Sequence, residues 1–130
     1  MKAVVDTNVV ISGIFFGGVP RRILEFAHQR LFSMVVSHEM LTEYTAVVDR
    51  LATKHPRVQG RQILDAIVAI SEVSLSVTLG QPIRADPTDD KFFAAALGAG
   101  AKRIASGDKY LKDASGWSGI EVFSRACPCI

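Results

Sequence analysis

The chain has 130 residues, of which 48% are hydrophobic and 22% charged, and a formal net charge of +2. This length and this apolar content predict one domain over residues 1–130 with a substantial core, and they exclude a disordered chain. The small positive charge permits contact with nucleic acid but does not by itself indicate it.

Short runs rich in β-branched residues alternate along the chain with segments of helical spacing. The predicted strands are Lys2–Val5, Phe32–Val36, Val73–Thr78, Arg103–Ala105 and Ile120–Phe123. The segments with apolar residues at helical spacing are Arg21–Arg30, Ser37–Leu51 and Arg61–Ile70. Strands that alternate with helices in this way predict an α/β domain with a mostly parallel sheet covered on both faces.

Polar residues and glycines mark the ends of the expected helices. Ser37 lies where an N-cap belongs, just before an apolar stripe begins. Asp86 and Pro87 predict the start of a further helix, with Asp89 at its N3 position. Gly98 and Gly100 mark the end of that helix.

The stretch after Lys2 does not have the form of a secretory signal, because Asp6 and Asn8 interrupt it. No apolar run approaches the length that crosses a bilayer. Both cysteines, Cys127 and Cys129, lie in the last four residues, where they cannot staple the domain. We therefore expect a cytoplasmic protein.

Several carboxylates lie where the predicted strands and helices meet one edge of the sheet. Asp6 comes directly after the first strand, and Asp108 follows the fourth strand after a short turn. Asp89 and Asp90 lie in the first turn of the helix that precedes the fourth strand, and Glu43 lies about two turns into the helix after the second strand. Because ligands of open parallel sheets bind outside the carboxyl ends of the strands, these acids are candidates for one shared site.

Glu43 is the acid whose position is most informative. It lies three residues after Met40 and four before Val47, so it faces the buried stripe or its border. A glutamate there costs stability unless it is paired, and the alternative is an ordinary solvated glutamate. Two unit charges 4 Å apart repel by about 4 kcal/mol at an effective dielectric constant of about 20. Converging carboxylates therefore bind protons or cations, and all-oxygen ligands favour Mg²⁺ or Mn²⁺, which suit phosphoryl chemistry.

Polar and basic residues beside these acids have two interpretations each. Asn8 and Ser106 could orient a carboxylate or a bound water; the alternatives are a helix cap for Asn8 and a plain turn for Ser106. Thr7 is interpreted as a polar residue at a helix start. The cations near the site are either phosphate contacts or ordinary surface: Arg21, Arg22, Lys91, Lys109 and Lys112.

Four motifs, in this order, resemble those of the PIN domain family. They are Asp6-Thr7-Asn8-Val9, Ser37-x-Glu39-x-Leu41-x-Glu43, Asp86-Pro87-x-Asp89-Asp90-Lys91-Phe92-Phe93 and Ser106-Gly107-Asp108-x-x-Leu111. The resemblance spans about residues 2–123 and is to the prokaryotic branch of VapC-like toxin components of toxin–antitoxin pairs. It implies a three-layer α/β/α fold with a five-stranded parallel sheet, and a Mg²⁺- or Mn²⁺-dependent endoribonuclease. It also implies a homodimer and an antitoxin that blocks the site.

The same resemblance implies the catalytic and metal-binding acids. Asp6, Glu43 and Asp108 match the first, second and fourth acids of the family. Asp89 or Asp90 matches the third; Asp89 is favoured because an N3 position lets it turn toward the strand edge, which leaves Asp90 a supporting role at the rim. The family often has another acid just after the fourth, and this chain does not. The number of metal ions that the site binds, one or two, therefore stays open.

Two further functions remain as alternatives. A flavodoxin-like phosphatase or phosphoacceptor domain would use Asp6 as its nucleophile, although Asn8 stands where such folds place a second acid. A PIN-like scaffold would bind RNA or a protein without cleaving it. Phe15 and Phe16 are interpreted as core, with an exposed patch for a second subunit or an antitoxin helix as the alternative.

Overall fold

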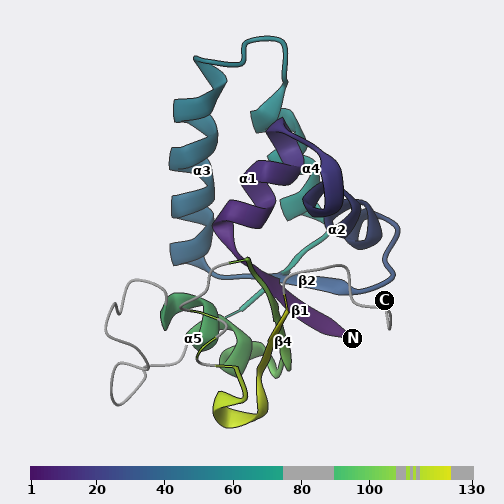
Figure 1. The fold of residues 1–130 in the computed structure, drawn as a ribbon, viewed down its shortest axis with the longest axis vertical. Coiled ribbons are helices and arrows are strands. Elements are labelled where there is room, and N and C mark those ends of the chain that lie inside the picture. The colour runs from purple at the N-terminus through teal and green to yellow at the C-terminus, as the bar shows by residue number, and fades with distance from the viewer. Residues whose placement is uncertain (75–89, 108–110, 112, 114, 124–130) are drawn as a thin grey trace.

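Five parallel strands form one sheet in the residues that the computed structural model describes, namely 1–74, 90–107, 111, 113 and 115–123 (Figure 1). The strands are β1 Lys2–Val5, β2 Ser33–Val36, β3 Glu72–Val73, β4 Arg103–Ala105 and β5 Glu121–Phe123. The predicted bounds of β1 and β4 are confirmed, and β2 and β5 each begin one residue later than predicted. β3 begins one residue earlier than predicted and ends at Val73, so the prediction is wrong for Ser74, and residues 75–78 of that prediction lie outside the described residues.

The strands are ordered β3-β2-β1-β4-β5, with β1 at the centre. Val4 of β1 pairs with Val35 of β2 on one side and with Ile104 of β4 on the other. The chain therefore extends the sheet first on one side of β1 and then on the other, so the strand order reverses between β1 and β4, where open α/β sheets bind ligands. A flavodoxin-like domain has the order 2-1-3-4-5, which this sheet does not have.

Helices cover both faces of the sheet. They are α1 Thr7–Phe15, α2 Gly18–His28, α3 His38–Ala52, α4 Gly60–Ala69 and α5 Asp90–Ala99. Figure 1 shows α1, α2 and α4 on one side of the strands and α5 on the other. Right-handed crossovers explain this arrangement, because the connection through α5 runs across the sheet in the opposite direction to the first two. The predicted three-layer α/β/α fold is confirmed.

The helix ends follow the predicted caps where these are described. Ser37 is the N-cap of α3, and its hydroxyl accepts a hydrogen bond from the backbone N–H of Met40 at 3.3 Å. α5 ends at Ala99, and Gly100 follows with φ of +72°, a left-handed conformation that glycine adopts at little cost. The predicted start at residues 86–89 lies outside the described residues, as do Cys127 and Cys129.

α1 is buried on most of its surface, but the two phenylalanines at its end differ strongly in exposure. Phe15 packs into the core and is 7% exposed, whereas Phe16, its C-cap, is 64% exposed. The interpretation of both residues as core is therefore wrong for Phe16.

None of the helices in the described ranges has the length and apolar composition that a membrane crossing requires.

Candidate active site

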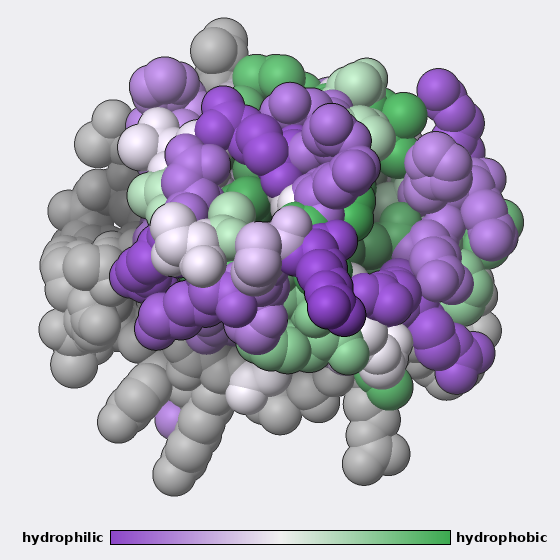
Figure 2. All heavy atoms as spheres, turned by 90° about the horizontal axis from the view of Figure 1, so that it is seen from above, coloured by the Kyte–Doolittle hydropathy of each residue, from purple (hydrophilic) through white to green (hydrophobic). Residues whose placement is uncertain are grey.

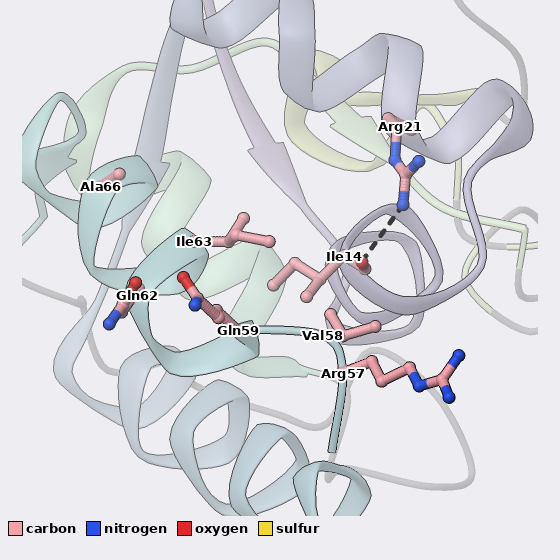
Figure 3. A pocket seen from close by; sticks show the side chains of 8 residues that line it. All are labelled: Ile14, Arg21, Arg57, Val58, Gln59, Gln62, Ile63 and Ala66. Carbon is pink, nitrogen blue, oxygen red and sulfur yellow. Dashed lines mark hydrogen bonds between the residues drawn. The ribbon is translucent and has the colours of Figure 1, made fainter. Parts of the chain in front are cut away.

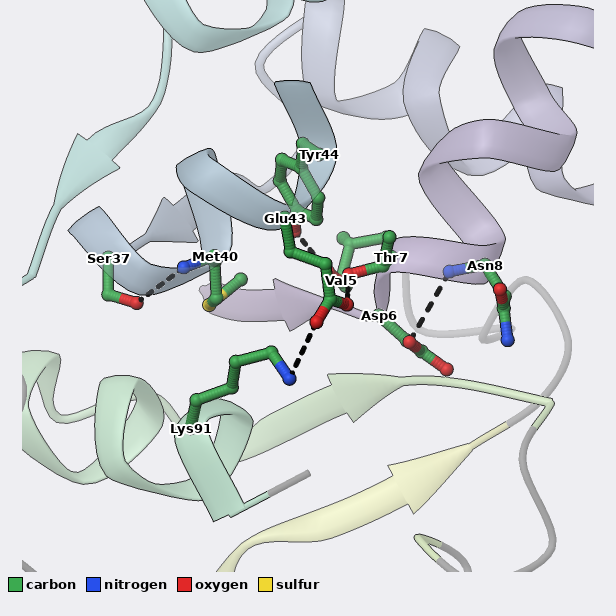
Figure 4. A network of polar contacts seen from close by, with 9 residues as sticks. All are labelled: Val5, Asp6, Thr7, Asn8, Ser37, Met40, Glu43, Tyr44 and Lys91. Atoms are coloured by element: carbon green, nitrogen blue, oxygen red, sulfur yellow. Dashed lines mark hydrogen bonds and ion pairs between the residues drawn. The ribbon is translucent and has the colours of Figure 1, made fainter. Parts of the chain in front are cut away.

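Asp6 lies at the carboxyl end of β1 and begins α1 as its N-cap (Figure 4). Its Oδ1 accepts a hydrogen bond from the backbone N–H of Asn8 at 3.3 Å, and its Oδ2 accepts one from the Ser106 hydroxyl at 2.6 Å. Asp6 is 4% exposed and Ser106 is fully buried. Ser106 directly follows β4, so this hydrogen bond spans the point where the strand order reverses. The carboxylate is thus fixed between the ends of two neighbouring strands, and the positive end of α1 favours its charge.

Glu43 reaches the same edge of the sheet from the second turn of α3. Its Oε1 accepts a hydrogen bond from the Thr7 hydroxyl, and its Oε2 lies 2.8 Å from Nζ of Lys91. The Glu43 side chain is 38% exposed, which agrees with its expected place at the border of the buried stripe. Figure 4 shows Glu43, Thr7 and Lys91 gathered beside Asp6 at the end of β1. Two acids 37 positions apart in the sequence therefore meet at one rim.

Tyr44 fixes the base of α3 to the end of β1. Its ring is fully buried, and its hydroxyl donates a hydrogen bond to the backbone carbonyl of Val5, the residue before Asp6. Burial raises the pKa of Tyr44 well above its ordinary value, and the negative charges of Asp6 and Glu43 raise it further. The hydroxyl therefore remains a protonated donor and holds the helix that carries Glu43 against the strand that carries Asp6.

Replacing Tyr44 with Phe is expected to lower the free energy of unfolding by about 1–3 kcal/mol, because the buried Val5 carbonyl loses its donor. Urea denaturation at neutral pH measures the change. The control is Thr42→Val, which removes a hydroxyl bonded to the His38 carbonyl at an exposed site and should change stability by less than about 0.5 kcal/mol. Equal losses in both variants would contradict the anchoring role of Tyr44.

The remaining expected acids are not placed. Asp89 and Asp108 lie outside the described residues, and for Asp90 only the backbone, at the start of α5, is described. Asn8 is exposed, and it is the backbone N–H of Asn8 that donates to Asp6. The alternative that Asn8 caps the helix is wrong, because Asp6 occupies the N-cap position.

The basic residues expected near the site are distributed differently. Arg21 donates hydrogen bonds to the carbonyls of Gly13 and Ile14 at the C-terminal end of α1, away from Asp6. Lys91 is the described cation that does lie at the site, and it contacts Glu43. Lys109 and Lys112 lie outside the described residues.

Thr7 is the residue whose role the sequence interpretation missed. It was expected only to begin a helix, yet its buried hydroxyl holds Glu43. A signal was present, since Thr7 is a hydroxyl residue directly beside the first acid. Its partner 36 residues away could not be read from that position alone.

The donor set at this edge fits a hard divalent cation. Asp6 and Glu43 provide carboxylate oxygens, and the hydroxyls of Thr7 and Ser106 hold them in place. Such all-oxygen sites bind Mg²⁺ or Mn²⁺ rather than softer metals. Among the described residues, no group of three His, Cys, Asp or Glu side chains comes together. A complete site would need carboxylates from the residues that are not described.

Comparison with known proteins gives two findings. The model of a family described as "PIN domain" matches residues 2–110. A chain of the crystal structure of VapBC2 from Rickettsia felis, bound to a DNA fragment from its promoter, superposes with a TM-score of 0.65 at 13% identity. The match covers 97% of this chain and 100% of that one, and it establishes the likeness of fold. No curated protein sequence matches this chain.

Proposed function

Because this chain belongs to the PIN domain family, we propose that it is a divalent-metal-dependent endoribonuclease and the toxin of a type II toxin–antitoxin pair. The observation that carries the proposal is the convergence of Asp6 and Glu43 at the carboxyl end of the central strand, each held by a hydroxyl group. A solvated surface glutamate would not require the buried Thr7 hydroxyl as a donor.

We assign Asp6 and Glu43 as ligands of Mg²⁺ or Mn²⁺, together with Asp108 and with Asp89 or Asp90. When bound, such an ion lowers the pKa of a coordinated water and stabilises charge on the leaving oxygen of a phosphodiester. The described residues supply the positioning. Ser106 fixes Asp6, and Thr7 orients Glu43.

The test is cleavage of a single-stranded RNA and of the DNA of the same sequence, each with Mn²⁺, with Mg²⁺ or with a chelator. The expected result is cleavage of RNA only when a divalent ion is present, with 5′-phosphate and 3′-hydroxyl ends on the products. RNA that is bound but left intact under all conditions would favour the scaffold alternative. Preferential cleavage of DNA would contradict the proposed substrate.

An antitoxin is the proposed protein partner, by analogy with the two-component VapBC2 complex. The surface proposed for it lies at the end of α1, where Phe16 is exposed and its ring meets His55 edge-on with centroids 5.4 Å apart. Beside it is a pocket of about 580 Å³ between α1, α2 and α4, shown in Figure 3 and lined by Ile14, Arg21, Arg57, Val58, Gln59, Gln62, Ile63 and Ala66. Figure 2 shows apolar surface framed by hydrophilic residues at this end of the molecule.

Replacing Phe16 with Ala is expected to weaken binding of the antitoxin by about tenfold, as truncation of an exposed aromatic anchor does at protein interfaces. The measurement is calorimetric titration of both variants with the proposed antitoxin, purified separately. Leu31→Ala is the control, since Leu31 is 52% exposed but follows α2 at its far end. A Phe16 variant that binds as tightly as the Leu31 variant would remove this surface from the proposal.

A homodimer and a cytoplasmic location complete the proposal, since the family resemblance implies the first and an RNA substrate implies the second. Sedimentation velocity tests the dimer directly. A single monomeric species across the micromolar range would contradict it without affecting the proposed activity.

A further inference from the structure

Lys91 forms an ion pair with one of the proposed metal ligands. It is the second residue of α5, and its Nζ lies 2.8 Å from Oε2 of Glu43 (Figure 4). The Lys91 side chain is only 17% exposed, and its Nζ also lies 4.7 Å from the centre of the Phe92 ring. The pair joins α3 and α5, which come from different parts of the chain, across the end of the central strand.

Lys91 lies in the first turn of its helix, where a positively charged side chain is usually disfavoured. The first turn of a helix carries partial positive charge, so a lysine there is disfavoured unless an acid compensates it. Glu43 supplies that compensation. Its other oxygen accepts from Thr7, so the carboxylate is held by a hydroxyl on one side and by an ammonium group on the other.

We propose that Lys91 is a positioning residue that holds Glu43 in place in the metal-free protein and competes with the metal ion for its carboxylate. The inference rests on the proposed function, because it takes Glu43 as a metal ligand. A dication that binds Oε2 of Glu43 would lie close to Nζ of Lys91, and the two like charges repel. The ammonium group must therefore move away when the metal ion enters. Lys91 thereby lowers the affinity of the site for metal and keeps the empty site ordered.

Two simpler roles for Lys91 make different predictions. A purely structural ion pair would stabilise the protein equally with and without metal. A contact to the phosphates of the substrate would affect the binding of RNA but leave the affinity for metal unchanged. Competition alone predicts that loss of the ammonium group tightens metal binding.

The experiment is a calorimetric titration of the whole protein with Mn²⁺, with a parallel measurement of Tm with and without Mn²⁺. Lys91→Met keeps the aliphatic stem over Phe92 and removes the charge, whereas Lys91→Arg keeps the charge. Lys102→Met is the matched control, because Lys102 is exposed and lies before β4, at the opposite edge of the sheet. If Lys91→Met does not fold, as judged by circular dichroism, Lys91→Gln replaces it in the comparison.

Lys91→Met is expected to bind Mn²⁺ about three- to tenfold more tightly than the wild type, the range that a partly exposed ion pair accounts for. Its Tm should fall in the absence of metal, and the difference should shrink at saturating Mn²⁺. Lys91→Arg and Lys102→Met should bind Mn²⁺ as the wild type does. Equal or weaker binding by the neutral Lys91 variant, while the wild type binds Mn²⁺ and cleaves RNA, would overturn this inference alone. A wild type and a variant that both fail to bind Mn²⁺ would overturn the proposed function as well.

Discussion

Replacing Asp6 with Asn is expected to reduce metal-dependent cleavage by more than about a hundredfold, since even the hydrogen-bonding partners of metal ligands are worth about 10- to 100-fold. The amide has nearly the shape of the carboxylate, so its one oxygen can still cap α1, while its NH₂ group can donate to the Ser106 hydroxyl, which then acts as acceptor. What it loses is the charge that would bind the cation. Initial rates of RNA cleavage with Mn²⁺ give the activity, and calorimetry gives the loss of metal binding.

The control for this variant is Asp49→Asn, which makes the same chemical change on α3 away from the site. Asp49 is 57% exposed and pairs with Arg61 at 3.2 Å, so its replacement should leave cleavage unchanged. Asp6→Asn should also unfold within about 1 kcal/mol of the wild type in the absence of metal, because the lost helix-end interaction is offset by relief of a buried charge. Cleavage by Asp6→Asn within tenfold of the wild-type rate would contradict the assignment of this residue.

The elements that were predicted well are those whose ends are marked by local chemistry. β1 ends where Asp6 interrupts an apolar run, and α3 begins where Ser37 offers a cap. The bounds of α1 could not be derived in the same way. Its residues from Val9 to Phe15 are apolar on most sides, so the stretch carries no stripe that distinguishes a buried helix from a strand. Nor does the sequence distinguish Phe15 from Phe16, because the exposure of Phe16 follows from where the helix ends.

General rules for strand ends and for helical spacing predict part of the site from the sequence. These rules place Asp6 and Ser106 together, since they follow adjacent parallel strands, and helical spacing places Glu43 at the border of the core. The contacts of Glu43 with Thr7 and Lys91 depend on how α1, α3 and α5 pack around the end of β1. Such pairings link residues far apart in the chain, and no local pattern encodes them.

The replacement of phenylalanine with alanine can be compared at two positions, Phe93 and Phe16, that differ strongly in burial. Phe93 lies on α5, is fully buried, and meets Trp117 edge-to-face with ring centroids 5.8 Å apart. Phe93→Ala is expected to cost about 3–5 kcal/mol of the free energy of unfolding, from lost apolar burial and from the cavity left behind. For a chain of this size the loss corresponds to a fall in Tm of roughly 10 °C or more.

Phe16→Ala should cost less than about 1 kcal/mol, because it removes a 64% exposed ring whose contact with His55 is at the surface. Urea denaturation of both variants in the absence of metal measures the two losses under the same conditions. α5 also carries Lys91, so a Phe93 variant that loosens this helix should weaken the pair with Glu43 and lose activity along with stability. A loss for Phe93→Ala no larger than that for Phe16→Ala would mean that α5 does not pack on the sheet as described, and the placement of Lys91 beside Glu43 would be wrong with it.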